Sequence, residues 1–188
     1  MDLSCLNDEF FTIQHLTQND NLDDFYVGQQ GYGLEKYLKE DAKEDEKIGL
    51  SRTYLIRRKD NGKIAAYFSL RTGLITVSRG FLQGFDTYTG IELANFAVDD
   101  FNRIEDERIP KMGAYIFAKF VFPLVSEIHD YVGAAFLYIF ALPEQKLIDH
   151  YKKIGFKQMD DIKAERYVYR HVKPYYDKGC KFMIMTID

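Results

Sequence analysis

The residues best suited to chemistry lie in the second half of the chain, between Ile91 and Phe156. A strand-like run and a polar loop are followed by Lys111-Met112-Gly113-Ala114, where an apolar helical pattern begins. The first turn of a helix presents unpaired backbone N–H groups and the positive end of the helix dipole, and both attract an anion. Tyr151 follows on a later helical segment and offers a proton donor. This order suits an enzyme that binds a phosphate-bearing cofactor and protonates a leaving group.

Several elements must position these groups. In chain order we expect a strand, a charged loop, a long helix, a central strand and a last helix, at Ile91–Val98, Asp99–Arg108, Lys111–Asp130, Ala134–Ala141 and Pro143–Gly155. The run Ala134–Ala141 is continuously apolar, which is typical of a strand buried on both faces of a sheet. Pro123 lacks a backbone N–H group, so we expect a kink in the long helix at that residue.

The remaining segments are mostly strand-like. We expect strands at Phe10–His15, Thr53–Arg58, Ile64–Leu70, Tyr167–His171 and Lys181–Thr186, helices at Asp23–Gln29 (stopped by Gly31 and Gly33) and Leu34–Lys47, and a long loop at Thr72–Tyr88. Asp60-Asn61-Gly62 predicts a hairpin turn because Asn-Gly supplies the positive φ values that such turns need. Strands in the first third and helices around a later central sheet indicate a mixed α/β or α+β domain.

Length and composition predict one folded domain over residues 1–188. Apolar residues make up 46% of the chain, yet no apolar run approaches the ~20 residues of a membrane-spanning helix. The N-terminus has no basic segment followed by an apolar one, so we expect no signal peptide and a cytoplasmic protein. The two cysteines and four histidines lack metal-ligand spacing, so we expect no metal. Cys5 and Cys180 are expected as reduced thiols, although a bond between them stays open.

The net charge of −4 argues against a protein coated in basic charge for nucleic-acid binding. Two local clusters of basic residues remain. One comprises Arg52, Arg57, Arg58 and Lys59, and the other Lys152, Lys153 and Lys157. Each cluster can form a basic face or belong to an ordinary solvated surface.

Three stretches together resemble the GNAT superfamily of acyl-CoA-dependent N-acyltransferases. Ile91–Asp99 looks like the central strand whose backbone pairs with the pantetheine arm of the cofactor. Arg108–Gly113 looks like the pyrophosphate loop, with the pattern R/Q-x-x-G-x-G/A, and Leu147–Phe156 looks like the last helix with its catalytic tyrosine. The resemblance implies a GNAT-like mixed central sheet flanked by helices. It also implies that acetyl-CoA is bound by Phe96, Ala97, Val98, Arg108, Lys111, Met112, Gly113 and Ala114.

The resemblance further implies direct transfer of an acetyl group from acetyl-CoA to a primary amine. Tyr151 would protonate the departing thiolate, Glu92 would act as a base for the amine, and Arg52 would bind an acidic part of the acceptor. Each residue also has a plainer interpretation. Tyr151 can be a packing tyrosine, Gly113 a small residue for close packing, Glu92 a solvated or paired carboxylate, and Arg52 an exposed surface side chain.

A narrower likeness, carried by Leu34–Ala42, Leu50–Leu55 and Ala66–Leu70, is to GNAT toxins of toxin–antitoxin pairs. It implies acetylation of the amino acid on an aminoacyl-tRNA, with an antitoxin protein as a partner. The loop departs from the family pattern, because Lys111 replaces a glycine and Pro110 removes an amide donor. A module that binds acyl-CoA or a protein without turnover therefore stays open. Edge strands such as Lys181–Thr186 offer a route to a homodimer.

Overall fold

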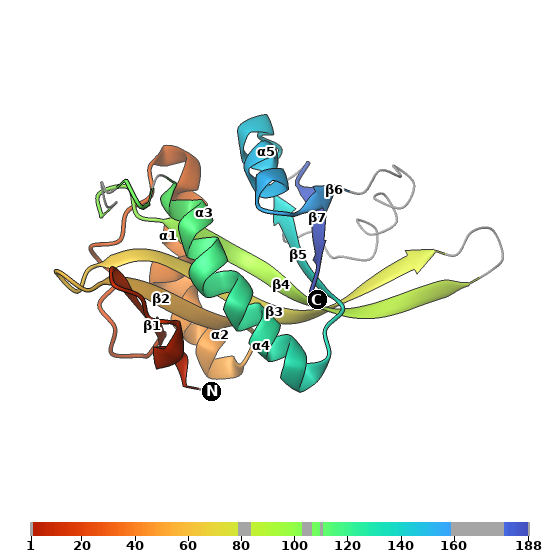
Figure 1. Ribbon diagram of the computed structural model, residues 1–188, viewed down its shortest axis with the longest axis horizontal. Coiled ribbons are helices and arrows are strands. Elements are labelled where there is room, and N and C mark those ends of the chain that lie inside the picture. The colour runs from red at the N-terminus through yellow and green to blue at the C-terminus, as the bar shows by residue number, and fades with distance from the viewer. Residues whose placement is uncertain (1, 79–83, 103–106, 110, 159–178, 188) are drawn as a thin grey trace. The chain divides into compact units, whose positions relative to one another are not determined.

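Figure 1 shows the computed structural model, which describes residues 2–78, 84–102, 107–109, 111–158 and 179–187. The chain divides into two units, one made of Met1–Arg71 and Leu93–Leu124 and the other of Thr72–Glu92 and Val125–Asp188. Strands β3 and β4 and helix α4 contribute residues to both units. A single domain over the whole chain stays a prediction.

Seven strands form one mixed sheet in the order β1-β2-β3-β4-β5-β7-β6. The strands are β1 (Phe11–His15), β2 (Arg52–Arg58), β3 (Ile64–Ser78), β4 (Phe85–Val98), β5 (Phe136–Ala141), β6 (Lys157–Gln158) and β7 (Lys181–Thr186). β4 and β5 are parallel, whereas the β1–β2, β2–β3, β5–β7 and β6–β7 pairs are antiparallel. A mixed sheet with helices beside it confirms the predicted fold class.

Among the described residues, the helices are a short 3-10 turn near the N-terminus, two long stretches, and one short helix nearer the end of the chain. They are η1 (Leu3–Leu6), η2 (Gln29–Gly31), α1 (Tyr32–Lys36), η3 (Tyr37–Asp41), α2 (Ala42–Ile48), α3 (Met112–Ile116), η4 (Phe117–Val121), α4 (Phe122–Val132) and α5 (Gln145–Lys153). The helix predicted at Leu34–Lys47 is thus confirmed, with a π-helical segment at η3. Among the described residues, no helix combines the length and apolar character needed to cross a membrane.

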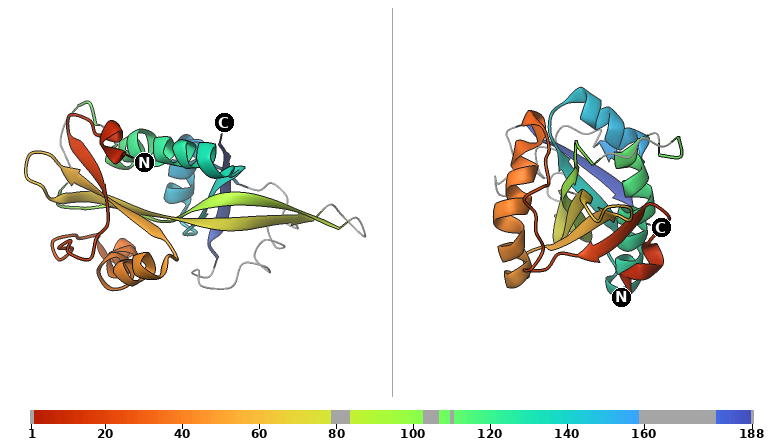
Figure 2. Two further views of the ribbon diagram at one scale, coloured as in Figure 1. Left: turned by 90° about the horizontal axis from the view of Figure 1, so that it is seen from below. Right: turned by 90° about the vertical axis from the view of Figure 1, so that its left-hand side faces the viewer.

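Helices cover both faces of the sheet in the first unit, with α1 and α2 on one side and α3 on the other (Figure 2). On the first side, Leu38 and Ala42 join a buried cluster with Leu55 and Tyr67. On the second side, the ring of Phe120 meets that of Phe11 edge-on, with 6.3 Å between the ring centres. Burial of these side chains on both faces supplies the hydrophobic stabilisation of this unit.

The prediction of a helix at Asp23–Gln29 is wrong. The segment has a turn at Asp23–Asp24 and no helix before η2. Carboxylates that follow β4 bind its backbone: the N–H of Tyr26 donates to Asp99 Oδ2 (2.7 Å) and the N–H of Gly28 donates to Asp100 Oδ2 (2.7 Å). These bonds satisfy the amides without a helix. The two glycines expected to stop that helix instead lie in η2 and α1.

The long loop predicted at Thr72–Tyr88 is also wrong, because β3 continues to Ser78 and β4 already begins at Phe85. Gly73 is a site of close approach and does not break the strand. A Cβ atom at Gly73 would lie 1.7 Å from the hydroxyl oxygen of Tyr138, so only glycine leaves room for that phenol.

Gly73→Ala should therefore lower the free energy of unfolding by about 1–3 kcal/mol through overpacking. For a chain of this length that corresponds to a fall in Tm of roughly 3–10 °C, measurable by thermal unfolding. Tyr138→Phe removes the clashing hydroxyl and should restore part of the loss in the double variant. Gly33→Ala is the control, because no atom lies within 4 Å of a Cβ built there. Equal Tm values for Gly73→Ala and the wild type would contradict the close contact.

The long helix begins within one residue of its predicted start and runs as α3, η4 and α4 from Met112 to Val132. The hydrogen-bond ladder changes just before Pro123, where η4 is π-helical and the N–H of Phe122 donates to the carbonyl of Phe117. Such wider turns are a common response of a helix to an irregularity in its ladder. A π-helical segment thus precedes the proline, and the kink expected at Pro123 stays a prediction.

Two predictions for the end of the chain need correction. Pro143 precedes the N-cap Glu144 of α5 and does not lie in the first turn of that helix. β7 lies between β5 and β6 and is not an edge strand, although β6 covers only two of its residues. The strand predicted at Tyr167–His171 falls outside the described residues. β5 and β7 are confirmed at nearly the predicted positions.

Candidate active site

The start of α3 offers the backbone donors that the sequence predicts. Lys111 is the N-cap, with φ −143° and ψ 89°, and no described side chain caps the helix. The first bond of the helical ladder runs from the N–H of Tyr115 to the carbonyl of Lys111 (2.9 Å). The N–H groups of Met112, Gly113 and Ala114 therefore have no partner in the helical ladder. Unpaired N–H groups at the positive end of a helix are donors of the kind that bind phosphate in proteins.

The side chain of Arg108 is held by the N-terminal segment. Its Nη1 donates to Glu9 Oε2 (2.7 Å), and its guanidinium lies over the ring of Phe10, 4.4 Å from the ring centre. Asp8 in turn accepts a hydrogen bond from the hydroxyl of Tyr115 (2.8 Å), in the first turns of the helix. Asp8–Phe10 thus fixes Arg108 and the start of the helix together. Burial, and next the hydrogen bond to Asp8, raise the pKa of Tyr115 to about 12.

The predicted pantetheine strand is part of β4. Its parallel pairing with β5 covers Gly90–Glu92 and ends there, so Phe96, Ala97 and Val98 lie beyond the paired stretch. Ala97 is buried in the cluster that contains Tyr67, whereas Phe96 and Val98 are half-buried. A role for these three residues would use their backbone groups.

Glu92 is 4% exposed, which excludes the solvated alternative for this carboxylate. It stands opposite Tyr138 in the register of β4 and β5. Carboxylates are rarely so buried unless they are paired or serve chemistry.

Tyr151 lies on α5 and is 9% exposed. Its ring packs edge-on against Phe156 (5.6 Å between ring centres) and His150 (5.8 Å). Burial raises the pKa of the Tyr151 phenol to about 12, so the phenol is protonated at every physiological pH. A protonated, nearly enclosed tyrosine satisfies one requirement of a general acid and is equally compatible with a packing role.

The side chain of Arg52 is hydrogen-bonded to Glu46. Its Nη1 donates to the carbonyl of Glu46 (2.9 Å) and to Glu46 Oε2 (3.1 Å). The same carboxylate pairs with His15 Nε2 at 3.0 Å and accepts a hydrogen bond from the N–H of Thr53. No local sequence pattern indicates this role for Glu46, because its partners come from separate strands.

The two basic clusters differ in the structure. Arg57 pairs with Asp20 (2.8 Å) and Arg58 pairs with Asp60, so carboxylates compensate much of the first cluster. Lys152, Lys153 and Lys157 are exposed around the end of α5 and the start of β6. The described residues contain no group of three or more His, Cys, Asp or Glu side chains arranged to hold a metal ion.

The candidate residues are divided between the two units. Those in the first unit are Arg52, Phe96, Ala97, Val98, Arg108, Lys111, Met112, Gly113 and Ala114, and those in the second are Glu92 and Tyr151. Within the first unit, the N-terminal segment connects Arg108 to the helix that begins at Met112.

Comparison with known proteins identifies the fold. No protein-family model and no curated protein sequence matches the chain. Among solved structures, a tyrosine-to-phenylalanine mutant of KacT matches with a TM-score of 0.67 at 18% identity, over 95% of this chain and 96% of that one. The fold is that of the GNAT toxins.

Two structures of the toxin AtaT are also similar to this chain. A tyrosine-to-phenylalanine mutant of the toxin AtaT, bound to the C-terminus of the antitoxin AtaR, matches with a TM-score of 0.65 at 17% identity, over 95% of this chain and 94% of that one. AtaT complexed with acetyl-methionyl-tRNAfMet matches with a TM-score of 0.63 at 18% identity, over 94% of each chain.

Proposed function

We propose that this chain is an acetyl-CoA-dependent N-acetyltransferase. The observation that carries the proposal is the uncapped start of α3, with three backbone N–H groups free of the helical ladder, in a chain with the GNAT fold. A solved structure of AtaTR bound with acetyl-CoA has the same fold, with a TM-score of 0.63. It supports a cofactor of the same kind here.

The residues at the helix start fit the pyrophosphate of acetyl-CoA. The N–H groups of Met112, Gly113 and Ala114 are hydrogen-bond donors, and the exposed Lys111 adds a positive charge. Arg108, two residues before Pro110 in the sequence, would add a second positive charge. Beyond the part of β4 that pairs with β5, Phe96–Val98 would offer backbone groups to the pantetheine arm. When bound, acetyl-CoA would supply an activated thioester.

Two residues of the second unit would assist the transfer. Tyr151 holds a proton that a departing thiolate can accept, because its raised pKa keeps the phenol protonated. Glu92 is the candidate base for the amine, directly or through water. A strong base is not required for an α-amino acceptor, whose ordinary pKa is about 7.7–8.0. Two neighbouring toxin structures carry a tyrosine-to-phenylalanine change, which supports a role for a tyrosine in this fold.

The acceptor we propose is the amino group of an aminoacyl-tRNA, because AtaT was solved with acetyl-methionyl-tRNAfMet. Arg52 would then contact an acidic or phosphate group of the acceptor. By the same argument, an antitoxin protein is a proposed partner, since AtaT binds the C-terminus of AtaR. The arginine cluster offers little uncompensated charge for RNA phosphates, so Lys152, Lys153 and Lys157 are the better candidates in the described chain.

The test is release of free thiol from acetyl-CoA by the purified chain, offered a panel of amines, aminoacyl-tRNAs and deacylated tRNA. We expect thiol release with an aminoacyl-tRNA and none with its deacylated form, and mass spectrometry should find the acetylated amino acid. Release with small amines only would retain the acetyltransferase and reject the tRNA acceptor. Binding of acetyl-CoA without any turnover would favour a non-catalytic binding module.

A further inference from the structure

We propose that an exposed pair of aromatic rings in the first unit, Tyr26 and Phe101, binds an arginine-bearing segment of a partner protein. The two rings are stacked, with 4.8 Å between their centres and 24° between their planes. Phe101 is 77% exposed and Tyr26 is 40% exposed, so the pair presents a flat apolar surface to water. This proposal goes beyond the catalytic function and does not depend on it.

A buried carboxylate holds both rings in place. Asp99 is 0% exposed, and its Oδ2 accepts a hydrogen bond from the N–H of Tyr26 (2.7 Å). Its Oδ1 accepts from the N–H groups of Phe101 (2.8 Å) and Asn102 (2.6 Å). The N–H of Asp100 also donates to the carbonyl of Tyr26 (2.9 Å). Because the surface is already ordered, a partner that binds it pays little for ordering these loops.

The two segments that carry the rings are acidic. Residues 19–34 and 93–102 contain five aspartates and neither lysine nor arginine. Asp20 is paired with Arg57, and Asp99 is buried. The other three lie within three residues of a ring in the sequence and are exposed: Asp23, Asp24 and Asp100. Negative charge attracts cations and repels phosphates, so this surface favours a basic protein segment over a nucleic acid.

The chain itself shows how an acid and an aromatic ring bind an arginine together. The guanidinium of Arg108 lies 4.4 Å from the ring centre of Phe10, and its Nη1 donates to the neighbouring Glu9 (2.7 Å). Asp100-Phe101 has the same order of acid and aromatic residue. Since 77% of Phe101 is exposed, the outer face of its ring is open to a similar contact.

Arginine fits this surface better than lysine. The guanidinium is planar and weakly hydrated, so it would stack on Phe101 while its edge donates to the carboxylate of Asp100. That carboxylate is itself positioned, because its Oδ2 accepts a hydrogen bond from the N–H of Gly28 (2.7 Å). One exposed contact of this kind is weak, so the partner needs several arginines along one segment.

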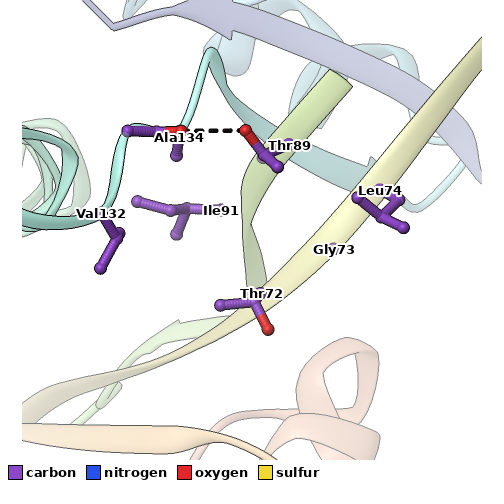
Figure 3. Close-up of a pocket in the computed structure, with 9 residues that line it drawn as sticks. Thr72, Gly73, Leu74, Thr89, Ile91, Val132 and Ala134 are labelled. Carbon is purple, nitrogen blue, oxygen red and sulfur yellow. Dashed lines mark hydrogen bonds between the residues drawn. The ribbon is translucent and has the colours of Figure 1, made fainter. Parts of the chain in front are cut away.

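A second exposed apolar surface provides the control. In the second unit, a pocket of about 290 Å³ lies between β3, β4 and the connection from α4 to β5 (Figure 3). Leu74 lines this pocket and is 65% exposed. None of the nine lining residues is ionisable, so the pocket offers apolar contact without a carboxylate. Loss of the Leu74 side chain should therefore not affect the binding of arginine.

The experiment measures binding of a short fluorescent peptide of alternating glycine and arginine to the full chain, by anisotropy. We expect a Kd on the order of micromolar, which rises with salt. Phe101→Ala should raise that Kd at least ~10-fold, because the guanidinium loses the ring on which it stacks. This variant keeps the charge of the chain, so it separates the ring from a general attraction of polycations. Asp100→Asn should also raise the Kd, and Leu74→Ala should leave it unchanged.

Matched peptides test the chemistry of the partner. A peptide of alternating glycine and lysine should bind more weakly, and one of glycine and glutamate should not bind. Equal Kd values for Phe101→Ala and the wild type would overturn the proposal, and so would equal affinity for the arginine and lysine peptides. Single-stranded RNA that binds more tightly than the arginine peptide, and loses its affinity in Phe101→Ala, would overturn it in favour of base stacking.

Discussion

Tyr151→Phe should lower kcat for acetyl transfer by about 10²-fold while leaving the affinity for acetyl-CoA nearly unchanged. The substitution removes only the hydroxyl, and the ring keeps its contacts with Phe156 and His150. Tyr54→Phe is the matched control, because Tyr54 is also 9% exposed and burial also raises the pKa of its phenol. A general acid predicts a large effect at Tyr151 and none at Tyr54, measured by steady-state thiol release.

The pH dependence of kcat separates proton donation from packing. Because burial raises the pKa of Tyr151 to about 12, the donor stays protonated through the assay range, and no fall in rate below pH 10 is expected from it. A rise near pH 8 should instead report deprotonation of an α-amino acceptor, whose ordinary pKa is 7.7–8.0. Equal kcat values for Tyr151→Phe and the wild type would assign Tyr151 to packing alone.

Gly113→Asp should abolish the stabilisation that acetyl-CoA gives to the folded chain. A carboxylate in the first turn of α3 would occupy the region where the free N–H groups attract phosphate, and it would repel that phosphate. At a ligand concentration of about 100 times Kd, binding adds roughly 2.7 kcal/mol, or about 5–10 °C in Tm, to the wild type. Thermal unfolding with and without acetyl-CoA measures the difference.

Gly33→Asp is the matched control, because Gly33 is the second residue of α1 just as Gly113 is the second residue of α3. Both substitutions place an acid near a helix N-terminus, where it does not weaken the helix. The control should keep the full shift in Tm. A shift retained in Gly113→Asp would place the cofactor elsewhere, and the failure of the wild type to shift would reject the cofactor altogether.

Local signals in the sequence predicted much of the fold. The Asn61-Gly62 turn is present with φ 71° at Gly62, and the apolar run before Ala141 is a central strand. The failure at Thr72–Tyr88 has a physical cause. A glycine at position 73 is typical of a loop when only its sequence neighbours are considered. In the structure, a side chain at this position would clash with the phenol of Tyr138, which is distant in the sequence. No local pattern contains that information.

In the candidate site, too, local features were predictable from the sequence and long-range contacts were not. The start of α3 was predictable because a strand, a loop and an apolar helical period follow each other along the chain. The pairing of Arg108 with Glu9, and the capture of Arg52 by Glu46, depend on long-range packing. The burial of Glu92 likewise depends on neighbours in the sheet, and the sequence alone left the carboxylate open to solvent.

The contacts of Asp8–Phe10 link the segment just before β1 to the start of α3. Asp8 bonds Tyr115, and Glu9 holds Arg108, so a phosphate bound beside Met112 would act on groups that the N-terminal segment also orders. Linkage is reciprocal, so a change that loosens that segment would weaken the binding of phosphate, and bound phosphate would disfavour the opening of that segment by the same free energy. Amide hydrogen exchange in β1, far from the chemistry in sequence, would then report cofactor occupancy.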